Sequence, residues 1–566
     1  MNSFVELTAR ERAEAIVDKG TFRELLDPYE NFRSPHLLKQ GIIAQNDDGM
    51  IVGKGTFNNK QAVVISMEGN FQGGGIGEVS GAKFAGALEL ALEDNKKGIP
   101  TQPIILFDTG GVRLQEANYG LLSISEIQAA IVELRNYQPL IGVIPGRIGC
   151  FGGMSMTAAL FSYLIITKEG RLTLNGPEVI EQEAGIKEFD ASDKVLIWNT
   201  LGGANRVATG YADYLAEDSL EDIVRIIGKC IGLGIPVHRS TKIDAYENLL
   251  ASINPKENLT PQGLQEYMKR HGFLEKDYTV KKVISNKKDH LQKQLPAQVI
   301  HSRGRSWFNG IVGKDYVNKS KIDSVMCGDI SLNGEVARVI TVVPDENSYY
   351  PRAKGGEVGL EQGWEIARCI REAMREDEGK VSRPIIAVVD TPSQAYGYKE
   401  ELLGIFLSCA SAVDAYASAR LAGHPVVTLI VGNAISGAFL AHGLQESYII
   451  SLDDDKIVVH AMSKKSAARI TKRSISEMDK AAADVPGIAY DIHSFNCLGA
   501  LNHLIKVNNH DAPLNEDINL IKAELIKGIK TSRENGNTLK YRLKTENAII
   551  YRALSIEVRE KLKELW

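Results

Sequence analysis

Residues 77–81 read GEVSG, and residues 356–360 read GEVGL. Each stretch leads into a segment in which apolar side chains recur at helical spacing, over residues 82–93 in the first case and 361–375 in the second. A motif that precedes the same kind of helix twice, far apart in one chain, indicates an internal repeat.

Four further features follow both stretches in the same order. An apolar strand ends in Asp-Thr, a proline opens a second apolar strand, a Gly-rich turn leads into a helix of small residues, and a third apolar strand closes the unit. They cover residues 104–109, 139–144, 149–159 and 163–167 in the first copy, and 385–391, 425–431, 432–442 and 448–452 in the second. This order predicts two related domains, over residues 1–250 and 301–566, that arose by duplication.

The strands of both copies are continuous apolar runs that alternate with helices. This pattern is typical of an α/β fold in which parallel strands are covered by helices. Residues 154–167 are the most apolar stretch, but they are shorter than the roughly 18–20 residues that cross a bilayer, so we predict a buried helix and a buried strand there. Near the start, Thr8 and Glu11 form a capping box, and we expect Gly20 to end that helix.

The composition is that of an ordinary globular protein. The chain has 566 residues, of which 44% are hydrophobic and 24% charged, so disordered and fibrous classes are excluded. A net charge of −5 gives no basic excess for nucleic acid, and six cysteines without a CxxC pair argue against a disulfide framework or a structural zinc site. Residues 2–24 mix acidic and basic side chains and contain no targeting signal, so the sequence favours a cytoplasmic protein without a membrane segment.

A segment with a weak hydrophobic pattern, residues 251–300, lies between the two predicted domains. Its basic residues include Lys269, Arg270, Lys276, Lys281, Lys282, Lys287 and Lys288. We interpret the segment as a charged linker. The alternative is a docking surface that attracts an acidic partner.

Glycine-rich turns stand where strands pass into helices, and ligands bind at such turns in α/β folds. They cover residues 73–77, 110–113 and 149–153 in the first half, and 391–397 and 432–438 in the second. Any single turn is explained by tight backbone geometry alone, but paired turns that recur in both halves favour a function. Their spacing does not fit a dinucleotide fingerprint, a phosphate-binding loop or a nucleophile elbow.

Such turns suit a reaction that needs backbone amides and little else. When the carbonyl oxygen of a thioester gains negative charge, as in an enolate, two N–H groups stabilise it, and glycine lets them come close. We expect one donor at the end of a strand and the other at the start of a helix, where N–H groups are unpaired. The candidate donors are Gly111, Val112, Gly152 and Gly153 in the first half, and Ser393, Gln394, Gly437 and Ala438 in the second.

Three stretches of the first half resemble the carboxyltransferase subunits of acyl-CoA carboxylases, which belong to the crotonase-like superfamily: residues 71–84, 110–117 and 176–182. Within this family the chain is most similar to the malonate decarboxylases, with a first half like their β subunit fused to a second half like their γ subunit. The γ likeness lies in residues 303–308, 356–364 and 390–397. The resemblance implies two tandem crotonase-like domains, each a ββα superhelix, related by internal duplication.

The resemblance implies an enzyme that removes CO₂ from a malonyl thioester through an enolate and releases the acetyl thioester. The malonyl group would be carried on an acyl carrier protein by a CoA-like prosthetic group, with no metal and no cofactor bound covalently to this chain. The implied partners are the acyl carrier protein subunit and an acyl-carrier transferase subunit of the same complex. A homodimer is also expected, because in relatives the site lies between an N-type and a C-type domain of different protomers.

The residues expected to bind substrate are Arg113, Gly110, Gly74 and Gly75. The Arg113 side chain would face the substrate carboxylate or the carrier phosphates. The alternative is a structural ion pair with Glu116 or Glu78.

Several polar residues near the turns have no assigned role. We expect Glu78 and Glu357 to occupy equivalent, buried structural places. The sequence does not choose a proton donor among Tyr119, Tyr396 and His442, and His442 on an apolar helix is more typical of a satisfied core residue.

Two other functions stay open. The first is a carboxyltransferase that moves the malonyl carboxyl group to biotin, with a second amide pair that polarises the biotin ureido oxygen. Biotin would then come from a partner, because the sequence has neither a biotin-carrier signature nor an ATP-grasp domain. The second is a non-catalytic scaffold that binds the acyl carrier protein, although intact glycine turns in both halves argue against it.

Overall fold

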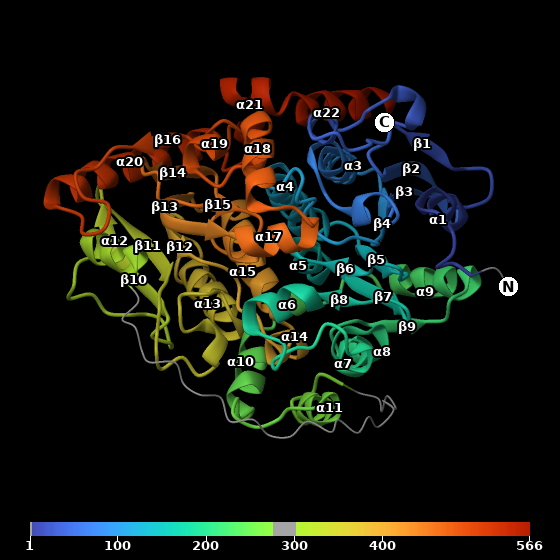
Figure 1. Cartoon of the computed structure of the whole chain (residues 1–566), viewed down its shortest axis with the longest axis horizontal. Helices are drawn as coiled ribbons and strands as arrows, with labels where there is room; N and C mark the ends of the chain where they lie inside the picture. Colours follow the sequence, from blue (N-terminus) through green and yellow to red (C-terminus); the bar gives the residue numbers. More distant parts are fainter. Residues whose placement is uncertain (1–2, 275–300) are drawn as a thin grey trace.

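The computed structural model describes residues 3–274 and 301–566. Its main feature is two separate seven-stranded sheets, one in each half of the chain, surrounded by helices (Figure 1). In this view the first half, blue to teal, lies at the right, and most of the second half, yellow to red, lies at the left. The two mixed α/β units agree with the prediction of one sheet for each copy of the repeat.

The first sheet contains β1 (Arg23–Leu25), β2 (Met50–Phe57), β3 (Lys60–Met67), β4 (Gln102–Leu106), β5 (Ile141–Ile144), β7 (Tyr163–Thr167) and β9 (Tyr214–Ala216), in that spatial order. β2 is antiparallel to both β1 and β3, and every later pair is parallel. A short parallel pair, β6 (Cys150–Phe151) with β8 (Leu172–Thr173), follows the second glycine turn.

The second sheet repeats this plan with β10 (Val325–Leu332), β11 (Glu335–Val342), β12 (Ile385–Thr391), β13 (Val426–Ile435), β14 (Tyr448–Leu452) and β16 (His503–Ile505). An antiparallel hairpin, β10 with β11, is again followed by parallel pairs. The short strand β15 (Val459–His460) pairs with the end of β13, as β8 pairs with β6 in the first half.

Helices cover both faces of each sheet. In the first half, α1 (Ala9–Ile16) and α9 (Leu220–Leu233) bury one apolar face, and α3 (Glu78–Lys96) packs on the other with α4 (Asn118–Leu134) against it. In the second half the corresponding layers are α12 (Arg303–Val312) with α20 (Asn515–Glu534), and α13 (Leu360–Glu376) with α15 (Ile405–Leu421). None of the described helices has the length and apolarity that a bilayer span requires.

The remaining α-helices of the described residues lie mostly in the connections. They are α2 (Pro35–Lys39), α5 (Gly153–Ala159), α6 (Pro177–Ala184), α7 (Lys194–Leu201), α8 (Gly203–Ala208), α10 (Ile243–Ser252), α11 (Pro261–Arg270), α14 (Tyr398–Leu402), α16 (Ser436–Ala441), α17 (Lys464–Thr471), α18 (Ile475–Asp484), α19 (Ile492–Asn496), α21 (Glu546–Tyr551) and α22 (Ala553–Leu565).

Most predicted elements have the expected type. Residues 154–167 form a buried helix and a buried strand, α5 and β7, as predicted. The capping box of Thr8 and Glu11 is confirmed at the start of α1, but Gly20 does not end that helix. The helix stops at Ile16 because the chain turns away so that the Asp18 N–H can donate to Thr56 O on β2, at 2.7 Å.

The predicted register of the repeat is wrong by three residues at its first motif. The sequence paired Gly77 with Gly356, but the structure places Gly359 at the position of Gly77. Both Gly77 and Gly359 stand directly before a long helix with nearly the same φ, −112° and −109°. Glu78 therefore corresponds to Leu360 and not to Glu357, because the shared letters GEV lie on different sides of the helix start.

Part of the predicted linker, residues 251–300, is ordered helix. Leu264 and Met268 of α11 are buried in the core, and Lys269 and Arg270 lie in the last turn of that helix. Lys276, Lys281, Lys282, Lys287 and Lys288 lie outside the described residues, so both interpretations of the segment stay predictions.

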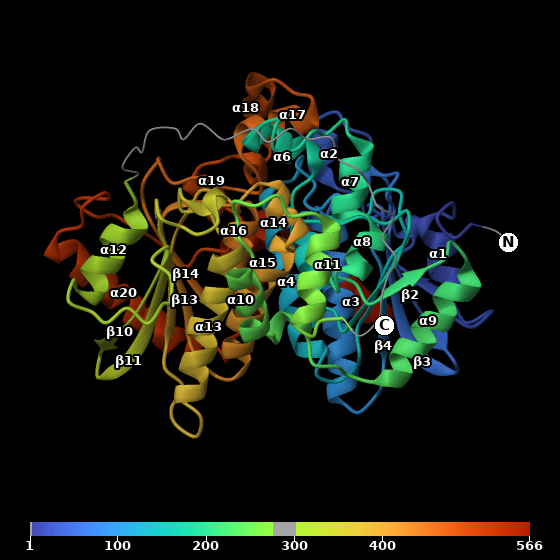
Figure 2. The ribbon, with the colours of Figure 1, turned by 90° about the horizontal axis from the view of Figure 1, so that it is seen from below.

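The two halves share one apolar core. A single cluster includes Met156 of α5 and Leu440 of α16, and α4 and α5 both pack against α15 (Figures 1 and 2). The helix α22, red in Figure 1, lies back across α3 of the first half. There the Ser555 N–H donates to Glu78 Oε1 at 2.9 Å, and Arg559 pairs with Glu126 at 2.7 Å.

A buried ion pair also crosses between the halves. Asp414 of α15 lies 2.6 Å from Arg135, which follows α4, and 3.0 Å from Arg371 of α13; the Asp414 side chain is not exposed at all. Burial alone would raise the pKa of Asp414, but the two guanidinium groups outweigh burial and hold this pKa below its ordinary value.

We expect Asp414→Asn to lower the free energy of unfolding by about 3–5 kcal/mol at neutral pH, because the buried guanidinium group of Arg135 and the partly exposed one of Arg371 lose their counter-charge. Since the folded pKa is depressed, the contribution of Asp414 is complete above its ordinary pKa of about 4 and is lost as the pH falls below that value. Denaturant unfolding from pH 3 to pH 7 should therefore show a steeper acid loss for the wild type than for the variant. Equal slopes would contradict the expectation.

Candidate functional site

The two glycine turns of the first half touch each other. A Cβ added to Gly111 would lie 3.2 Å from Gly152 Cα, and one added to Gly152 would lie 3.4 Å from Gly111 Cα. Both residues have positive φ, 97° and 59°, which L side chains rarely adopt. The fold thus brings the end of β4 and the start of α5 together, as expected for a pair of donors.

Two of the four predicted donors are already used within the chain. The Gly111 N–H donates to Thr109 Oγ1 at 3.0 Å, and the Gly152 N–H donates to Leu174 O at 3.1 Å. Across residues 3–274 and 301–566, the N–H groups of Val112 and Gly153 have no acceptor. Because unpaired N–H groups are costly to bury, these two, which we call the first amide pair, suit a ligand oxygen.

Asp108 ties the two turns to each other. Its Oδ1 accepts from Ile148 N at 2.8 Å and from Gly149 N at 3.2 Å, and its Oδ2 lies 3.0 Å from Arg12 Nη1. The Asp108 and Arg12 side chains are 1% and 2% exposed, so this support is buried.

The glycines predicted to bind substrate pack against the same turn. A Cβ on Gly74 would lie 2.0 Å from Asp108 O, and one on Gly75 would lie 3.0 Å from Arg113 Cα. The Gly110 N–H donates to Gly73 O at 2.7 Å, and Gly110 itself is exposed. Gly74 and Gly75 therefore support the turn from behind, and Gly110 alone of the three lies open to solvent.

Arg113 adopts the ion-pair alternative. Its Nη1 lies 2.6 Å from Asp48 Oδ1 and 2.7 Å from Glu116 Oε2, and all three side chains are at most 1% exposed. Burial raises the pKa of Asp48 to about 6 in spite of Arg113. Sequence analysis predicted the ion pair with Glu116 but not the one with Asp48. Because both carboxylates hold the Arg113 guanidinium group, it is not directed at a substrate in this arrangement.

The second half contains an equivalent pair of turns. Val112 forms an isolated bridge with Ile76, and Gln394 forms the same bridge with Val358. Gly153 and Gly437 each follow a residue with φ near 60°, namely Gly152 at 59° and Ser436 at 60°.

By these matches Gln394 corresponds to Val112, and Gly437 corresponds to Gly153. We call the N–H groups of Gln394 and Gly437 the second amide pair. Of the other predicted donors, Ser393 has its carbonyl bonded to Val358 N at 3.0 Å, and Ala438 is buried in α16.

A side chain occupies the Gly437 N–H of the second amide pair. The Gly437 N–H donates to Gln394 Oε1 at 3.0 Å, and Gln394 Nε2 donates to Asn175 Oδ1 at 2.7 Å. Asn175 belongs to the first half, so this bridge crosses between the halves. In the first half, the side chain of Val112 has no atom that could accept from the Gly153 N–H.

The two amide pairs lie at the contact between the halves of one chain. A Cβ on Gly153 would lie 2.6 Å from Leu440 Cδ1 of the second half. A Cβ on Gly437 would lie 3.3 Å from Leu174 Cδ1 and Met156 Sδ of the first half. One chain therefore already combines the elements that were expected from two protomers.

The other polar candidates are engaged in the core. His442 lies 2.8 Å from the Tyr416 hydroxyl and 3.1 Å from Val388 O, and burial lowers the pKa of His442 to about 4, so it is a satisfied core residue as expected. Tyr119 stacks on His36 with ring centroids 4.1 Å apart. Burial raises the pKa of both Tyr119 and Tyr396.

Glu78 has the buried structural role that was predicted for it. Its Oε2 lies 2.6 Å from His36 Nε2, and its Oε1 accepts from Ser555 N. Burial raises the pKa of Glu357, whose Oε2 accepts from Gly355 N at 2.7 Å.

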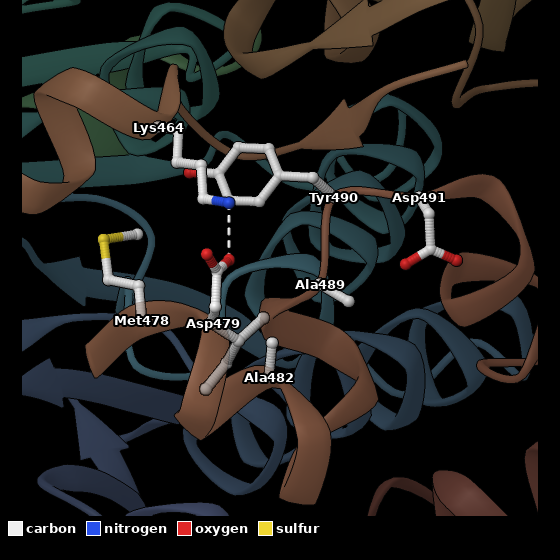
Figure 3. Close-up of a pocket in the computed structure, with 8 residues that line it drawn as sticks. Lys464, Met478, Asp479, Ala482, Ala489, Tyr490 and Asp491 are labelled. Atoms are coloured by element: carbon white, nitrogen blue, oxygen red, sulfur yellow. Dashed lines mark ion pairs between the residues drawn. The ribbon is translucent and has the colours of Figure 1, made fainter. Parts of the chain in front are cut away.

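A cavity of about 220 Å³ opens between α17, α18 and the segment 488–491 (Figure 3). One lining residue, Ala489, accepts a hydrogen bond from Asn118 Nδ2 at 3.4 Å, so the cavity adjoins the start of α4. Lys464 Nζ lies 2.5 Å from Asp479 Oδ1 across it, as Figure 3 shows. This pairing neutralises the only cationic side chain among the lining residues. No group of metal-binding side chains occurs in the described part of the chain.

Comparison with known proteins identifies the family of the chain. A family model described as the malonate decarboxylase gamma subunit matches residues 353–566. The malonyl-S-ACP:biotin-protein carboxyltransferase MADC of Malonomonas rubra is 46% identical over 228 residues, which are 38% of this chain and 72% of that protein. The chain belongs to the malonate decarboxylase family of carboxyltransferases. The family match confirms the γ likeness predicted for the second half.

Further relatives carry related names. The malonyl-S-ACP:biotin-protein carboxyltransferase MADD of Malonomonas rubra is 37% identical over 164 residues, which are 28% of this chain and 56% of that protein. A Pseudomonas malonate decarboxylase hetero-tetramer in complex with malonate is 50% identical, with a TM-score of 0.47 over 47% of this chain and 97% of its own. Members of the family are enzymes, so the scaffold alternative has no support.

Proposed function

We propose that this chain decarboxylates a malonyl thioester and releases CO₂ and the acetyl thioester. The observation that carries the proposal is the first amide pair, Val112 and Gly153, whose N–H groups have no acceptor among the described residues and lie on turns that touch each other. Two preorganised N–H donors stabilise a developing oxyanion, and losing one donor costs about 10²–10³ in rate.

In the proposed reaction the bond between the carboxylate and the α-carbon breaks, and its electron pair moves toward the thioester oxygen. The enolate oxygen accepts hydrogen bonds from the Val112 and Gly153 N–H groups while CO₂ leaves. The α-carbon then takes a proton to give the acetyl thioester. Arg12 and Asp108 hold the two turns in register through this step.

The proposal includes the finer features implied by the family. The thioester would be carried on an acyl carrier protein by a CoA-like group, and an acyl-carrier transferase subunit would load it. The two sheets with the same strand plan support two tandem crotonase-like domains that arose by duplication. A homodimer stays a prediction, although Gly153 already contacts Leu440 within one chain and needs no second chain to do so.

Transfer of the carboxyl group to biotin on a partner is the second candidate. The names of the two Malonomonas rubra relatives favour it, because both are malonyl-S-ACP:biotin-protein carboxyltransferases. The second amide pair would then have to polarise the ureido oxygen. The Gln394 side chain bonded to Gly437 does not fit that task.

We expect Gly153→Val to remove more activity than Gly437→Val if the chain is a decarboxylase, because only one oxyanion then needs donors. A Cβ at Gly153 would also lie 2.6 Å from Leu440 Cδ1, so the valine could act by pushing the two halves apart. The double variant Gly153→Val with Leu440→Ala removes that clash and leaves only the crowding of the substrate oxygen. Rates of acetyl-thioester formation measure the difference. If Gly437→Val is as damaging, carboxyl transfer gains support over decarboxylation.

The decisive experiment is mass spectrometry of the products that the chain forms from malonyl-loaded carrier protein, with and without avidin. The proposal expects acetyl carrier and CO₂ in equal amounts, with no effect of avidin. Since biotin would have to come from a partner, acetyl carrier that forms only when a biotinylated partner protein is added, and that avidin then abolishes, would refute direct decarboxylation.

A further inference from the structure

The two halves carry different side chains at one pair of equivalent positions beside the first and second amide pairs. Where the second half has Gln394, the first half has Val112. The partner position differs as well. Asn175 lies two residues after β8 and Met462 two residues after β15, and the helices α6 and α17 then start at equivalent places. A polar bridge between the halves is therefore built at the second amide pair and replaced by apolar side chains at the first.

The direction of every hydrogen bond in this bridge is fixed. Asn175 Nδ2 donates to Ala395 O at 3.1 Å, so its Oδ1 is the atom that accepts from Gln394 Nε2. Gln394 Oε1 must then face the Gly437 N–H. The Asn175 N–H in turn donates to Glu401 Oε1 at 2.6 Å, which holds the asparagine in place.

The bridge is also sealed from water. Gln394 and Asn175 are 4% and 1% exposed, and Glu401 is fully buried. A ligand carbonyl that approached the Gly437 N–H would have to displace the amide of Gln394 and leave Asn175 Oδ1 without its donor. Leaving a buried polar atom unpaired is costly, so displacement is disfavoured.

We propose that Gln394 is a built-in cap on the second amide pair and a specificity-determining residue, so that only the first half accepts a substrate oxyanion. This inference rests on the proposed function. The cap excludes a ureido carbonyl such as that of biotin from the second half, and the carboxyl group therefore leaves as CO₂ because no acceptor is activated next to it.

Removing the cap should allow a transfer that is balanced in atoms. The C–C bond of the malonyl group breaks, a new C–N bond forms to the ureido nitrogen, and the proton of that nitrogen passes to the enolate carbon. The sum is malonyl thioester plus biotin giving acetyl thioester plus N-carboxybiotin, with no further reactant.

The test uses the full chain with Gln394→Val, which copies the first half, and Gln394→Met, which keeps the side-chain length without the amide. Gln394→Glu is the matched control, because in its protonated form, which burial favours, the carboxyl group still accepts from Gly437 and donates to Asn175 Oδ1. Residue-resolved hydrogen exchange should show the Gly437 amide exchanging about tenfold faster in the Val and Met variants and near the wild-type rate in the Glu variant. Unchanged exchange in both the Val and Met variants would overturn the cap.

The second measurement uses biotin methyl ester as the probe, with malonyl-loaded carrier protein. We expect N-carboxybiotin to rise at least about tenfold over wild type in the Val or Met variant, in line with the recovery of one oxyanion donor. Faster exchange without this rise would overturn the role in specificity. If no variant forms acetyl thioester, the proposed function fails, whereas the exchange result still decides whether Gln394 is a cap.

Discussion

Val112→Gln is expected to lower the turnover of a malonyl thioester by about 10²–10³-fold, the loss that follows removal of one oxyanion donor. The substitution gives the first half the side chain that caps the second. In the second half this side chain accepts from the Gly437 N–H at 3.0 Å, and Gly153 is the equivalent amide. Single-turnover rates of acetyl-thioester formation from malonyl-loaded carrier protein measure the effect.

Two controls separate capping from crowding. Val112→Met has a similar length but no amide oxygen, so its loss should be much smaller than that of Val112→Gln. Adding Met462→Asn to Val112→Gln gives the new glutamine an asparagine partner, as Asn175 is the partner of Gln394. This double variant should be the least active of the three. Equal losses for Gln and Met at position 112 would mean that bulk, and not hydrogen bonding, blocks the site.

Asp108→Asn is expected to reduce turnover about 10²-fold, because a misplacement of catalytic groups by about 1 Å has that cost. Asp108 Oδ1 holds the Ile148 and Gly149 N–H groups, and its Oδ2 faces Arg12 Nη1. An asparagine would direct an N–H₂ group at the guanidinium or lose both turn bonds. The loss of the buried counter-charge should also lower the free energy of unfolding by about 3–5 kcal/mol.

Asp390→Asn is the matched control, because Asp390 occupies the equivalent strand end. It accepts from Asn433 N at 3.1 Å and Gly304 N at 3.2 Å, and none of its hydrogen bonds within the described residues comes from an arginine. If the first half carries the reaction, the Asp390 variant should keep most of the turnover when rates are measured per folded molecule at low temperature. A loss at Asp390 as large as that at Asp108 would contradict a single working site.

Much of the fold follows from local sequence patterns. The apolar runs at residues 163–167, 385–391 and 448–452 became strands with those bounds, because each is buried on both faces and carries its own signal. The start motif was matched in the wrong register, since GEV precedes the helix in one half and enters it in the other. Helix starts are set by capping bonds, such as Gly359 N–H to Gln362 Oε1, which shared letters do not reveal.

The candidate site was predictable as backbone and less so as side chains. The glycine turns at residues 110–113 and 149–153 predict where amides would face a ligand, and the structure brings these turns into contact. The partners that decide which amides are free are distant in sequence. Gln394 meets Gly437 43 positions away and Asn175 219 positions away, and Arg113 meets Asp48 65 positions away. No spacing rule for a single element predicts such pairs.

The helix α22 is synthesised long after α3, the helix that it covers. Glu78 and its partner Ser555 are 477 positions apart. At roughly 5–20 residues per second, a ribosome needs roughly 25–95 s to synthesise the interval between them. Throughout that time the face of α3 that α22 covers has no partner and is open to chaperones. The first half therefore completes its surface only after the second half has been synthesised, although each half has a sheet of its own.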